Sequence, residues 1–404
     1  MARIAIVDLL FNWPPDGGAR TDVKEVAQRL AQDHEICIFV PDFCLGFPRG
    51  QIKGDFPVKV KKVSFNKYSF NFIQIARRFK REVDKYKPDT VFITDGWYLK
   101  PYLVNALKKY KPILRFYAYE SLCLRGHGIF YNKGKLCEKN YLNGSFICAC
   151  ECLKCSIDWL KKVRDKKFVH EFLTAFVFSP LYLWIVRTAL RNSGKIIVYN
   201  DFIKNKVICY NKNVLLIPSG VDINLFKNKG NSKDSKIKIF MAGRIEDDLK
   251  GASVLFEACM RLNKDHYKFE LLLTTDREFE QEYITSVGWL SQEDLADFYQ
   301  KVDICVIPSV WPEPFGIVAL EAMASGKSVI VTRVGGLQHI IENNKEGFVV
   351  EPNDVDDLTI KLKYLIDNPE IRERMGCLGR EKVENNYDWD IIYKKHYVPL
   401  FVGK

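Results

Sequence analysis

Two glutamates eight residues apart, Glu313 and Glu321, belong to the run "WPEPFGIVALEAMASG" at 311–326. Carboxylates accept hydrogen bonds from hydroxyl groups such as those of a sugar and a ribose. The apolar residues between them predict a helix that begins just after Gly316. The free N–H groups of that first turn suit a phosphate, which a glycine lets approach closely. The spacing therefore indicates either a sugar and phosphate site or two ordinary helix-surface carboxylates.

A second run, "FMAGRIEDDLKGASVLFEA" at 240–258, carries Arg244 and Lys250 between a strand pattern and an amphipathic helix pattern. The fork of an arginine and the point charge of a lysine are the groups that bind a diphosphate. The alternative is an exposed ion pair with Asp247 or Asp248. We interpret the two cations as a candidate diphosphate site.

The net charge of +11 is unevenly divided along the 404 residues. Residues 1–234 hold 40 Lys and Arg against 21 Asp and Glu, and residues 235–404 hold 21 against 29. This division indicates that the first half meets something anionic, or that it carries a solvated basic surface without a partner.

The elements that must position these residues alternate between strand and helix patterns in both halves. Continuous apolar runs of this kind are typical of buried parallel strands. In the first half these are "RIAIVD", "EICIFV", "TVFITDG", "ILRFYAY" and "KIIVYN". In the second they are "KIKIFMAGRI", "FELLLTT", "ICVIPS", "SVIVTR" and "GFVV". The sequence therefore predicts an α/β protein with two doubly wound domains.

The polar run "KNKGNSKDSK" separates the two series and predicts a linker. The expected parts are an N-terminal domain at 1–226, a linker at 227–236, a C-terminal domain at 237–385 and a last helix, 386–404, that packs back on the first domain. The start of the chain is typical of a buried strand ending at Asp8 rather than of a targeting peptide, so we expect a cytoplasmic protein.

In their order along the chain these segments resemble the retaining glycosyltransferases of the GT-B architecture, in particular glycosyltransferase family 4. The resemblance implies two Rossmann-like domains facing a central cleft. It rests on "PPDGGA", "IPSGVD", "AGRIEDDLKG", "GWLSQEDLADFYQKVDICVIPS", "EPFGIVALEAMASGKSVIVTRVGG" and "YDWDIIYKKHY".

The resemblance also implies roles for individual residues. Glu313 would contact the donor sugar and act in catalysis, Glu321 would contact the nucleotide ribose, and Arg244 and Lys250 would bind the diphosphate. The remaining expected donor contacts are a glycine pair in the first loop and three backbone amides: Gly17, Gly18, Phe315, Gly316 and Ile317.

The reaction that the resemblance implies is transfer of a sugar from a UDP- or GDP-sugar to an acceptor hydroxyl with retention at the anomeric carbon. No metal is needed, because Arg244, Lys250 and a helix N-terminus can carry the charge of the leaving diphosphate. The chain departs from the family pattern at Tyr119 and Glu120, where relatives often have His-Asp. Glu120 therefore becomes a candidate for catalytic contact with sugar or acceptor. Another departure is His339, most simply a residue without a catalytic role.

Six of the twelve cysteines lie between residues 123 and 155. A reducing compartment disfavours structural disulfides. Four of these thiols could hold a structural zinc ion: Cys123, Cys137, Cys152 and Cys155. The alternative is a set of free or redox-active thiols.

The run "FLTAFVFSPLYLWIV" at 172–186 has no charged residue but is too short to span a bilayer, and Pro180 interrupts it. With "KKVRDKK" at 161–167 before it, the run could lie on an anionic membrane surface, or it could form a packed helix pair. In the first case, the protein would be peripheral on the inner face of the membrane.

The expected function is hexosyl transfer in cell-surface glycan or glycolipid synthesis, with a glycan or lipid-linked acceptor and no nucleic acid partner. One alternative is a sugar-nucleotide epimerase of the same architecture, which would need further acid and base groups than Glu120 and His339. The other is a non-catalytic protein whose basic first half binds nucleic acid, although no recognition motif supports it.

Overall fold

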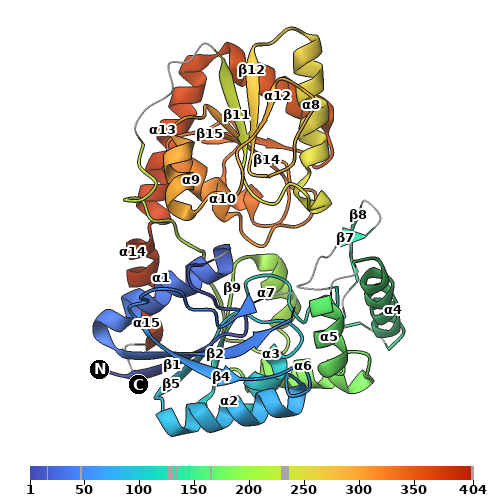
Figure 1. The fold of residues 1–404 in the computed structure, drawn as a ribbon, viewed down its shortest axis with the longest axis vertical. Helices are drawn as coiled ribbons and strands as arrows, with labels where there is room; N and C mark the ends of the chain where they lie inside the picture. Colours follow the sequence, from blue (N-terminus) through green and yellow to red (C-terminus); the bar gives the residue numbers. More distant parts are fainter. Residues whose placement is uncertain are drawn as a thin grey trace. The chain divides into compact units, whose positions relative to one another are not determined.

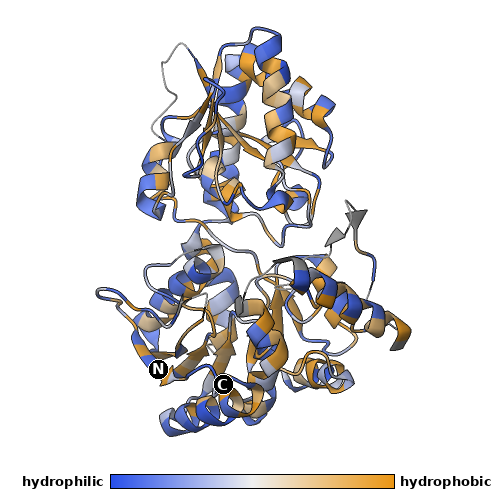
Figure 2. Ribbon diagram, turned by 45° about the vertical axis from the view of Figure 1, so that its right-hand side comes forward, coloured by the Kyte–Doolittle hydropathy of each residue, from blue (hydrophilic) through white to orange (hydrophobic). Residues whose placement is uncertain are grey.

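The computed structural model describes residues 1–15, 17–45, 48–125, 131–132, 135–139, 141–144, 146–163, 166–228 and 236–401. The chain divides into two compact units, Met1–Pro218 with Tyr393–Lys404, and Ser219–Ile392. Each unit contains a sheet with helices packed against it (Figure 1). Figure 2 shows that the strands are mainly apolar, whereas most helices carry one hydrophobic and one hydrophilic face. This is the pattern expected when both faces of a sheet are covered.

The first unit is built on an eight-stranded sheet. Its strands are β1 (Arg3–Val7), β2 (Glu35–Cys44), β3 (Pro48–Arg49), β4 (Lys59–Ser64), β5 (Thr90–Ile93), β6 (Ile113–Arg115), β9 (Lys195–Val198) and β10 (Val214–Leu216). From β10 the order runs β9, β6, β5, β1 and β2, and β2 also pairs with β4 and with the antiparallel β3. A hairpin of β7 (Tyr131–Asn132) and β8 (Lys135–Leu136) is separate. Apart from β3, every strand of the sheet is parallel, as predicted.

Helices cover both faces of this sheet. They are α1 (Gly18–Asp33), α2 (Phe72–Tyr86), α3 (Lys100–Ala106), α4 (Phe146–Val163), α5 (Lys166–Thr174), α6 (Pro180–Asn192), α7 (Asp201–Val207) and α15 (Val398–Phe401). The apolar run 172–186 is not one helix: α5 ends at Thr174, a turn follows, and α6 begins with Pro180 after the cap Ser179. None of the described helices is long and apolar enough to cross a bilayer.

The second unit is built on a six-stranded parallel sheet in the order β13, β12, β11, β14, β15, β16. Its strands are β11 (Ile237–Met241), β12 (Phe269–Leu273), β13 (Ile284–Ser286), β14 (Ile304–Ile307), β15 (Ser328–Thr332) and β16 (Gly347–Val350). Its helices are α8 (Ala252–Lys264), α9 (Gln292–Tyr299), α10 (Ile317–Ala324), α11 (Leu337–Ile340), α12 (Val355–Asp367), α13 (Pro369–Asn386) and α14 (Trp389–Ile392). The sequence did not predict β13, because its three half-buried residues make no apolar run.

The division between the units differs from the expected one. The chain enters the second unit at Ser219, before the expected linker 227–236, of which 229–235 lie outside the described residues. The reason is that 219–226 is fastened to the end of α13 and the start of α14. The backbone N–H of Val221 donates to the carbonyl of Tyr387 at 2.9 Å.

The C-terminal segment 386–404 was expected to be one helix on the first domain. It begins instead at the end of α13 and continues as α14, a π-helical turn and α15. The chain leaves the second unit after Ile392. In the first unit, Tyr397 and Phe401 pack edge-on against Phe92 of β5, with ring centroids 6.4 Å and 6.1 Å away.

Candidate functional site

The second sheet reverses its strand order between β11 and β14. In open parallel sheets, ligands bind outside the carboxyl ends of the strands at this kind of reversal. The loops that follow the two strands are 242–250 and 308–316, which carry the residues predicted to bind the donor. Strand order therefore brings these two sequence motifs to one edge of the sheet.

Two contacts hold the loops together. The backbone N–H of Val310 donates to the carbonyl of Leu249 at 2.9 Å. Gly251 has φ +75°, and a Cβ on it would lie 2.0 Å from the carbonyl oxygen of Pro308. Only glycine fits this close approach, so Gly251 fixes the position of Lys250 relative to the loop after β14.

Lys250 and Glu313 form an ion pair at this edge, with Nζ 2.5 Å from Oε1. The same Oε1 accepts hydrogen bonds from Ser309 Oγ at 2.8 Å and Trp311 Nε1 at 3.1 Å. Burial by itself would raise the pKa of Glu313, but Lys250 and these hydrogen bonds outweigh it and lower the pKa. Glu313 is therefore a buried carboxylate that stays ionised.

The second carboxylate oxygen of Glu313, Oε2, has no hydrogen-bond partner in the part of the chain that the structure describes. A carboxylate oxygen can accept up to two hydrogen bonds. Oε2 is thus available for a hydroxyl group. Nothing in the sequence indicated a role for Ser309 or Trp311, although Trp311 begins the run that carries Glu313 and Ser309 lies two residues before it.

The glycine pair Gly335 and Gly336 shapes the backbone around Glu313. The N–H of Gly336 donates to the carbonyl of Glu313 at 2.6 Å. Gly335 has φ +49°, and a Cβ on it would lie 2.0 Å from that same carbonyl oxygen. A Cβ on Gly336 would lie 2.6 Å from Cα of Phe315. No role for this pair could be predicted from the sequence, because the contact joins residues that are distant along the chain.

Gly316 caps α10 with φ +118°, a conformation that favours glycine. A Cβ there would lie 2.4 Å from Cδ2 of Leu337. Backbone conformation and packing on Leu337 are therefore sufficient reasons for a glycine here, and the close approach of a phosphate to Gly316 stays a prediction. The amides of Phe315, Gly316 and Ile317 lie at the start of α10, as the sequence predicted.

Glu321 lies in α10 with 6% of its surface exposed. Burial raises its pKa to about 8, and a hydrogen bond from Gln292 partly opposes the rise. The carboxyl group is therefore mostly neutral at pH 7, and it can donate as well as accept a hydrogen bond. The sequence predicted an acceptor only at this position.

Arg244 is exposed in the loop after β11. Among the described residues it makes no salt bridge with Asp247 or Asp248, so the alternative of a surface ion pair is not what the structure shows. Asp247 instead caps the turn at Leu249 N. Nearby, the backbone N–H of Gly243 donates to Thr274 Oγ1 at 2.7 Å, and this hydrogen bond fastens the Arg244 loop to the end of β12.

The first sheet reverses its order between β1 and β5, and Asp8 joins the loops after them. Its carboxylate accepts hydrogen bonds from Leu10 N at 2.7 Å, Thr94 Oγ1 at 2.7 Å and Asp95 N at 3.0 Å. Burial, and then the neighbouring Asp95, raise the pKa of Asp8 to about 6. The sequence offered one signal for this role, an aspartate directly after the first apolar strand.

Glu120 lies close to this aspartate pair, but it is only 1% exposed. Its Oε1 lies 3.6 Å from Lys100 Nζ and accepts from Tyr117 N at 3.2 Å. Burial raises its pKa, Lys100 opposes the rise, and Asp95 adds to it. Glu120 is enclosed by protein beside a buried lysine, an arrangement typical of a structural ion pair. Its contact with sugar or acceptor stays a prediction.

Gly17 caps α1 and Gly18 begins it. The carbonyl of Gly17 accepts from the N–H of Thr21 at 3.1 Å, which closes the first turn. Both glycines belong to the first unit, whereas Arg244 and Lys250 belong to the second. Their predicted part in donor binding stays a prediction.

The cysteine cluster lies around α4. Cys152 is half-buried, and its pKa is raised to about 12 by burial and by the neighbouring Cys148, Cys123 and Cys137. All twelve cysteines are free thiols. Within the described residues no three or more His, Cys, Asp or Glu side chains are arranged to hold a metal ion. The zinc site at Cys123, Cys137, Cys152 and Cys155 stays a prediction, which measuring the zinc content of the purified protein would test.

Comparison with known proteins identifies the family of this chain. Residues 222–382 match the family model "Glycosyl transferases group 1". An uncharacterized glycosyltransferase of Methanocaldococcus jannaschii is 31% identical over 245 residues, which are 56% of this chain and 67% of that protein. The chain belongs to the glycosyl transferases group 1 family. Assignment of this group 1 glycosyltransferase to family 4 stays a prediction. The matched part spans 67%, 62% and 45% of the first three curated relatives.

Solved structures share the whole fold of this group 1 glycosyltransferase. The sucrose-phosphate synthase of Thermosynechococcus elongatus has a TM-score of 0.70 and 20% identity, with 100% of both chains covered. Anabaena HepE, solved in complex with UDP and glucose, has a TM-score of 0.67 and 14% identity, also over 100% of both chains. At these identities the likeness shows the fold alone, and it confirms the predicted GT-B fold.

Proposed function

We propose that the protein transfers a hexose from a nucleotide diphosphate-sugar to an acceptor hydroxyl with retention at the anomeric carbon. The observation that carries the proposal is the Lys250–Glu313 pair at the strand-order reversal of the second sheet. A cation for a diphosphate and an ionised carboxylate for sugar hydroxyls lie side by side there. These are the two chemistries that recognition of a nucleotide-sugar requires.

In this proposal the cationic groups bind the diphosphate, and the carboxyl groups bind the sugar and the ribose. Lys250, exposed Arg244 and the amides at the start of α10 would stabilise the leaving diphosphate, which gains negative charge as the sugar leaves. The free Oε2 of Glu313 would accept a sugar hydroxyl, and neutral Glu321 would exchange hydrogen bonds with the ribose. We propose that no metal is required, because this chain's own cations and helix start supply the positive charge.

The relatives support a transferase over the two alternatives. The curated relative quoted above is named a glycosyltransferase, and HepE was solved with UDP and glucose. A sugar-nucleotide epimerase would need further exposed acid and base groups. Glu120 does not supply one, because it is enclosed. A non-catalytic nucleic-acid-binding protein would leave the Lys250–Glu313 site without a use.

The acceptor that we propose is a glycan or a lipid-linked glycan, in synthesis of cell-surface glycans or glycolipids. The cell compartment that fits this role is the cytoplasm, where nucleotide-sugars are the donors. The support is indirect, from family membership and from the basic first half of the chain.

Calorimetric binding of UDP and GDP tests the donor site. We expect the wild-type protein to bind one of them and Arg244→Ala to bind it more weakly, whereas Lys264→Ala, an exposed lysine at the end of α8, should bind like wild type. The nucleotide that binds decides which nucleotide-sugars are tested as donors in a turnover assay. NMR of the product then gives its anomeric configuration. Binding of neither nucleotide would overturn the proposal.

A further inference from the structure

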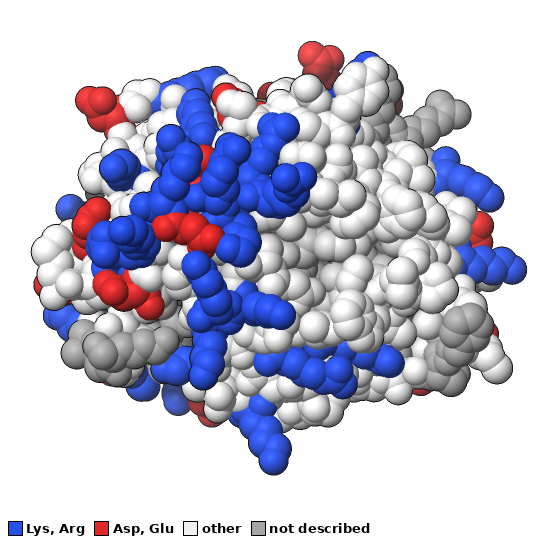
Figure 3. All heavy atoms as spheres, turned by 90° about the horizontal axis from the view of Figure 1, so that it is seen from below, with Lys and Arg blue, Asp and Glu red and all other residues white. Residues whose placement is uncertain are grey.

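The first unit carries a basic surface on β4 and α2, which we define by Lys61, Lys62, Arg77, Arg78, Arg81 and Lys85. These residues line a hollow of about 1240 Å³ between the strand and the helix. Figure 3 shows Lys and Arg gathered over part of one face, with a largely uncharged stretch beside them. β4 is an edge strand that pairs only with β2, so its lysines are not covered by a further strand.

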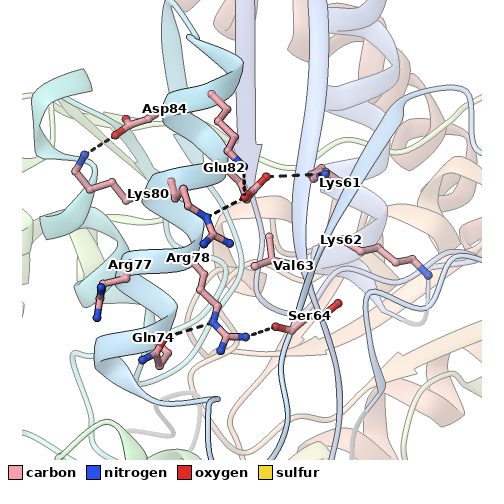
Figure 4. A pocket seen from close by; sticks show the side chains of 12 residues that line it. Lys61, Lys62, Val63, Ser64, Gln74, Arg77, Arg78, Lys80, Glu82 and Asp84 are labelled. Atoms are coloured by element: carbon pink, nitrogen blue, oxygen red, sulfur yellow. Dashed lines mark hydrogen bonds and ion pairs between the residues drawn. The ribbon is translucent and has the colours of Figure 1, made fainter.

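The acidic residues of this basic surface do not neutralise it. Residues 59–87 contain ten Lys and Arg against two Asp and Glu. Glu82 is shared by Lys85 at 3.1 Å, Arg81 at 3.1 Å and Lys61 at 3.9 Å. Figure 4 shows Arg78 reaching Ser64 and Glu82 reaching Lys61 across the hollow. The surface therefore keeps a strong positive charge.

Lys62 and Arg77 are the most available cations of the basic surface. Both are exposed, and neither makes a salt bridge with any described residue. In Figure 4 their side chains extend away from the paired residues. Lys62 and Arg77 can therefore bind an anionic partner at little cost in free energy, because no ion pair within the protein has to be broken.

An exposed apolar surface adjoins the basic one. We define it by Phe176 and Phe178 in the turn between α5 and α6, and by Leu181 and Trp184 in α6. Their exposed fractions are 48%, 41%, 67% and 62%. The ring of Phe176 contacts Phe72, the first residue of α2, at 5.5 Å between centroids. Trp184 lies one turn after Leu181 in α6, so the two share one helix face. The apolar surface thus continues from the start of the basic helix.

We propose that the basic and apolar surfaces together bind the surface of an anionic phospholipid bilayer. Lysine and arginine attract anionic head groups, while exposed Phe, Leu and Trp side chains enter the boundary between head groups and acyl chains. A soluble polyanion would use the cations but leave four large apolar side chains in water. The inference does not depend on the proposed function, because neither surface includes a residue of the donor site.

The sequence predicted, as one of two alternatives, a membrane contact at the apolar run 172–186, with the basic run 161–167 before it. The membrane contact that we propose is instead centred on the basic residues of β4 and α2. Of that range, the side chains of 162–167 lie outside the description, and Tyr182 and Val186 are buried in the first unit. The exposed apolar side chains of this range that could contact lipid are Leu173 in α5 and those of the α5–α6 turn and the first turns of α6.

Co-sedimentation of the full chain with vesicles tests the proposal. We expect it to bind phosphatidylcholine vesicles containing about 30% phosphatidylglycerol at least about tenfold more tightly than pure phosphatidylcholine, and to release them in about 0.5 M salt. Equal binding to both vesicles, or no binding to either, would overturn the proposal. So would binding to soluble polyphosphate without binding to vesicles, which would favour a polyanion instead.

Two double variants separate the two surfaces. Lys62→Glu with Arg77→Glu, and Leu181→Ser with Trp184→Ser, should each weaken vesicle binding at least about tenfold. All four positions are exposed, so each variant should keep the wild-type melting temperature. Matched controls in the second unit are Lys264→Glu with Lys268→Glu, and Met260→Ser with Ile360→Ser, all exposed. Equal losses in variants and controls would show that these surfaces are not the binding face.

Discussion

Lys250 Nζ lies 2.5 Å from Glu313 Oε1, although 63 residues separate them in the sequence. The pair forms because β11 and β14 are neighbours in the sheet and their following loops are fastened at Leu249 and Val310. Each residue thereby has a charged partner ready before any ligand arrives. A bound diphosphate would share Lys250 with Glu313.

Replacing Lys250 tests that sharing. Lys250→Met keeps the length of the side chain but removes the charge, so we expect nucleotide affinity to fall roughly 10- to 100-fold, the range of a lost charged hydrogen bond. It also removes the strongest of the groups that lower the pKa of Glu313. Calorimetry with the nucleotide that the wild type binds measures the loss. Lys264→Met is the matched control, and an unchanged affinity in Lys250→Met would exclude Lys250 from the donor site.

Glu321 predicts a dependence of stability on pH. Its pKa is about 8 in the folded protein against 4.5 as the ordinary value, so between these two the folded state holds a proton that the unfolded state releases. The free energy of unfolding should therefore fall as pH rises from 5 to 8, by on the order of 3 kcal/mol from this group. Glu321→Gln cannot ionise and should show a flatter profile in urea titrations. Parallel profiles for both proteins would contradict the raised pKa.

The same variant separates a neutral from an ionised carboxyl in binding. An amide reproduces the donor and acceptor of a neutral acid. We expect Glu321→Gln to keep nucleotide affinity within about threefold and Glu321→Ala to lose about tenfold, a typical value for one hydrogen bond. If Gln and Ala lose equally, an ionised carboxylate contacts the ribose.

Replacing Gly335 should weaken donor binding while the protein still folds. A Cβ there would lie 2.0 Å from the carbonyl oxygen of Glu313, so Gly335→Ala must displace the loop that carries the carboxylate. Gly54→Ala is the control, because Gly54 has φ +73° but nothing within 4 Å of its Cβ position. Both changes strain the backbone by about 1 kcal/mol. We expect only Gly335→Ala to weaken nucleotide binding by more than about tenfold, and similar affinities in the two variants would contradict this role.

Substitutions of Glu120 distinguish a structural role of this residue from a catalytic one. Glu120→Ala leaves Lys100, which is 3% exposed, without its carboxylate, and we expect it to destabilise the first unit by about 3 kcal/mol. Nucleotide affinity should not change, because Lys250, Glu313 and Glu321 all belong to the second unit. Thermal melting and calorimetry measure the two effects. Lost turnover in Glu120→Gln at an unchanged melting temperature would restore the catalytic assignment.

The alternation of strands and helices was predictable from the sequence. A parallel strand that is buried on both faces is apolar at every position, so its pattern does not depend on the register of pairing. The prediction of strands failed where burial is partial, as in β13. The interruption of the apolar run at Pro180 was predicted, and α6 begins at that residue. The domain boundary also moved, because the contact of Val221 with Tyr387 joins segments that no local pattern connects.

The sequence by itself determined the class of fold, the family and the residue types that meet a nucleotide-sugar, since these follow from composition, period and motif order. Only the tertiary structure decided that Lys250 pairs with Glu313, that Glu321 is neutral and that Glu120 is enclosed. It also decided that the lysines of β4 share one surface with the arginines of α2. The physical reason is that pKa, pairing and exposure depend on which elements are neighbours in space, and strand order sets those neighbours across long stretches of chain.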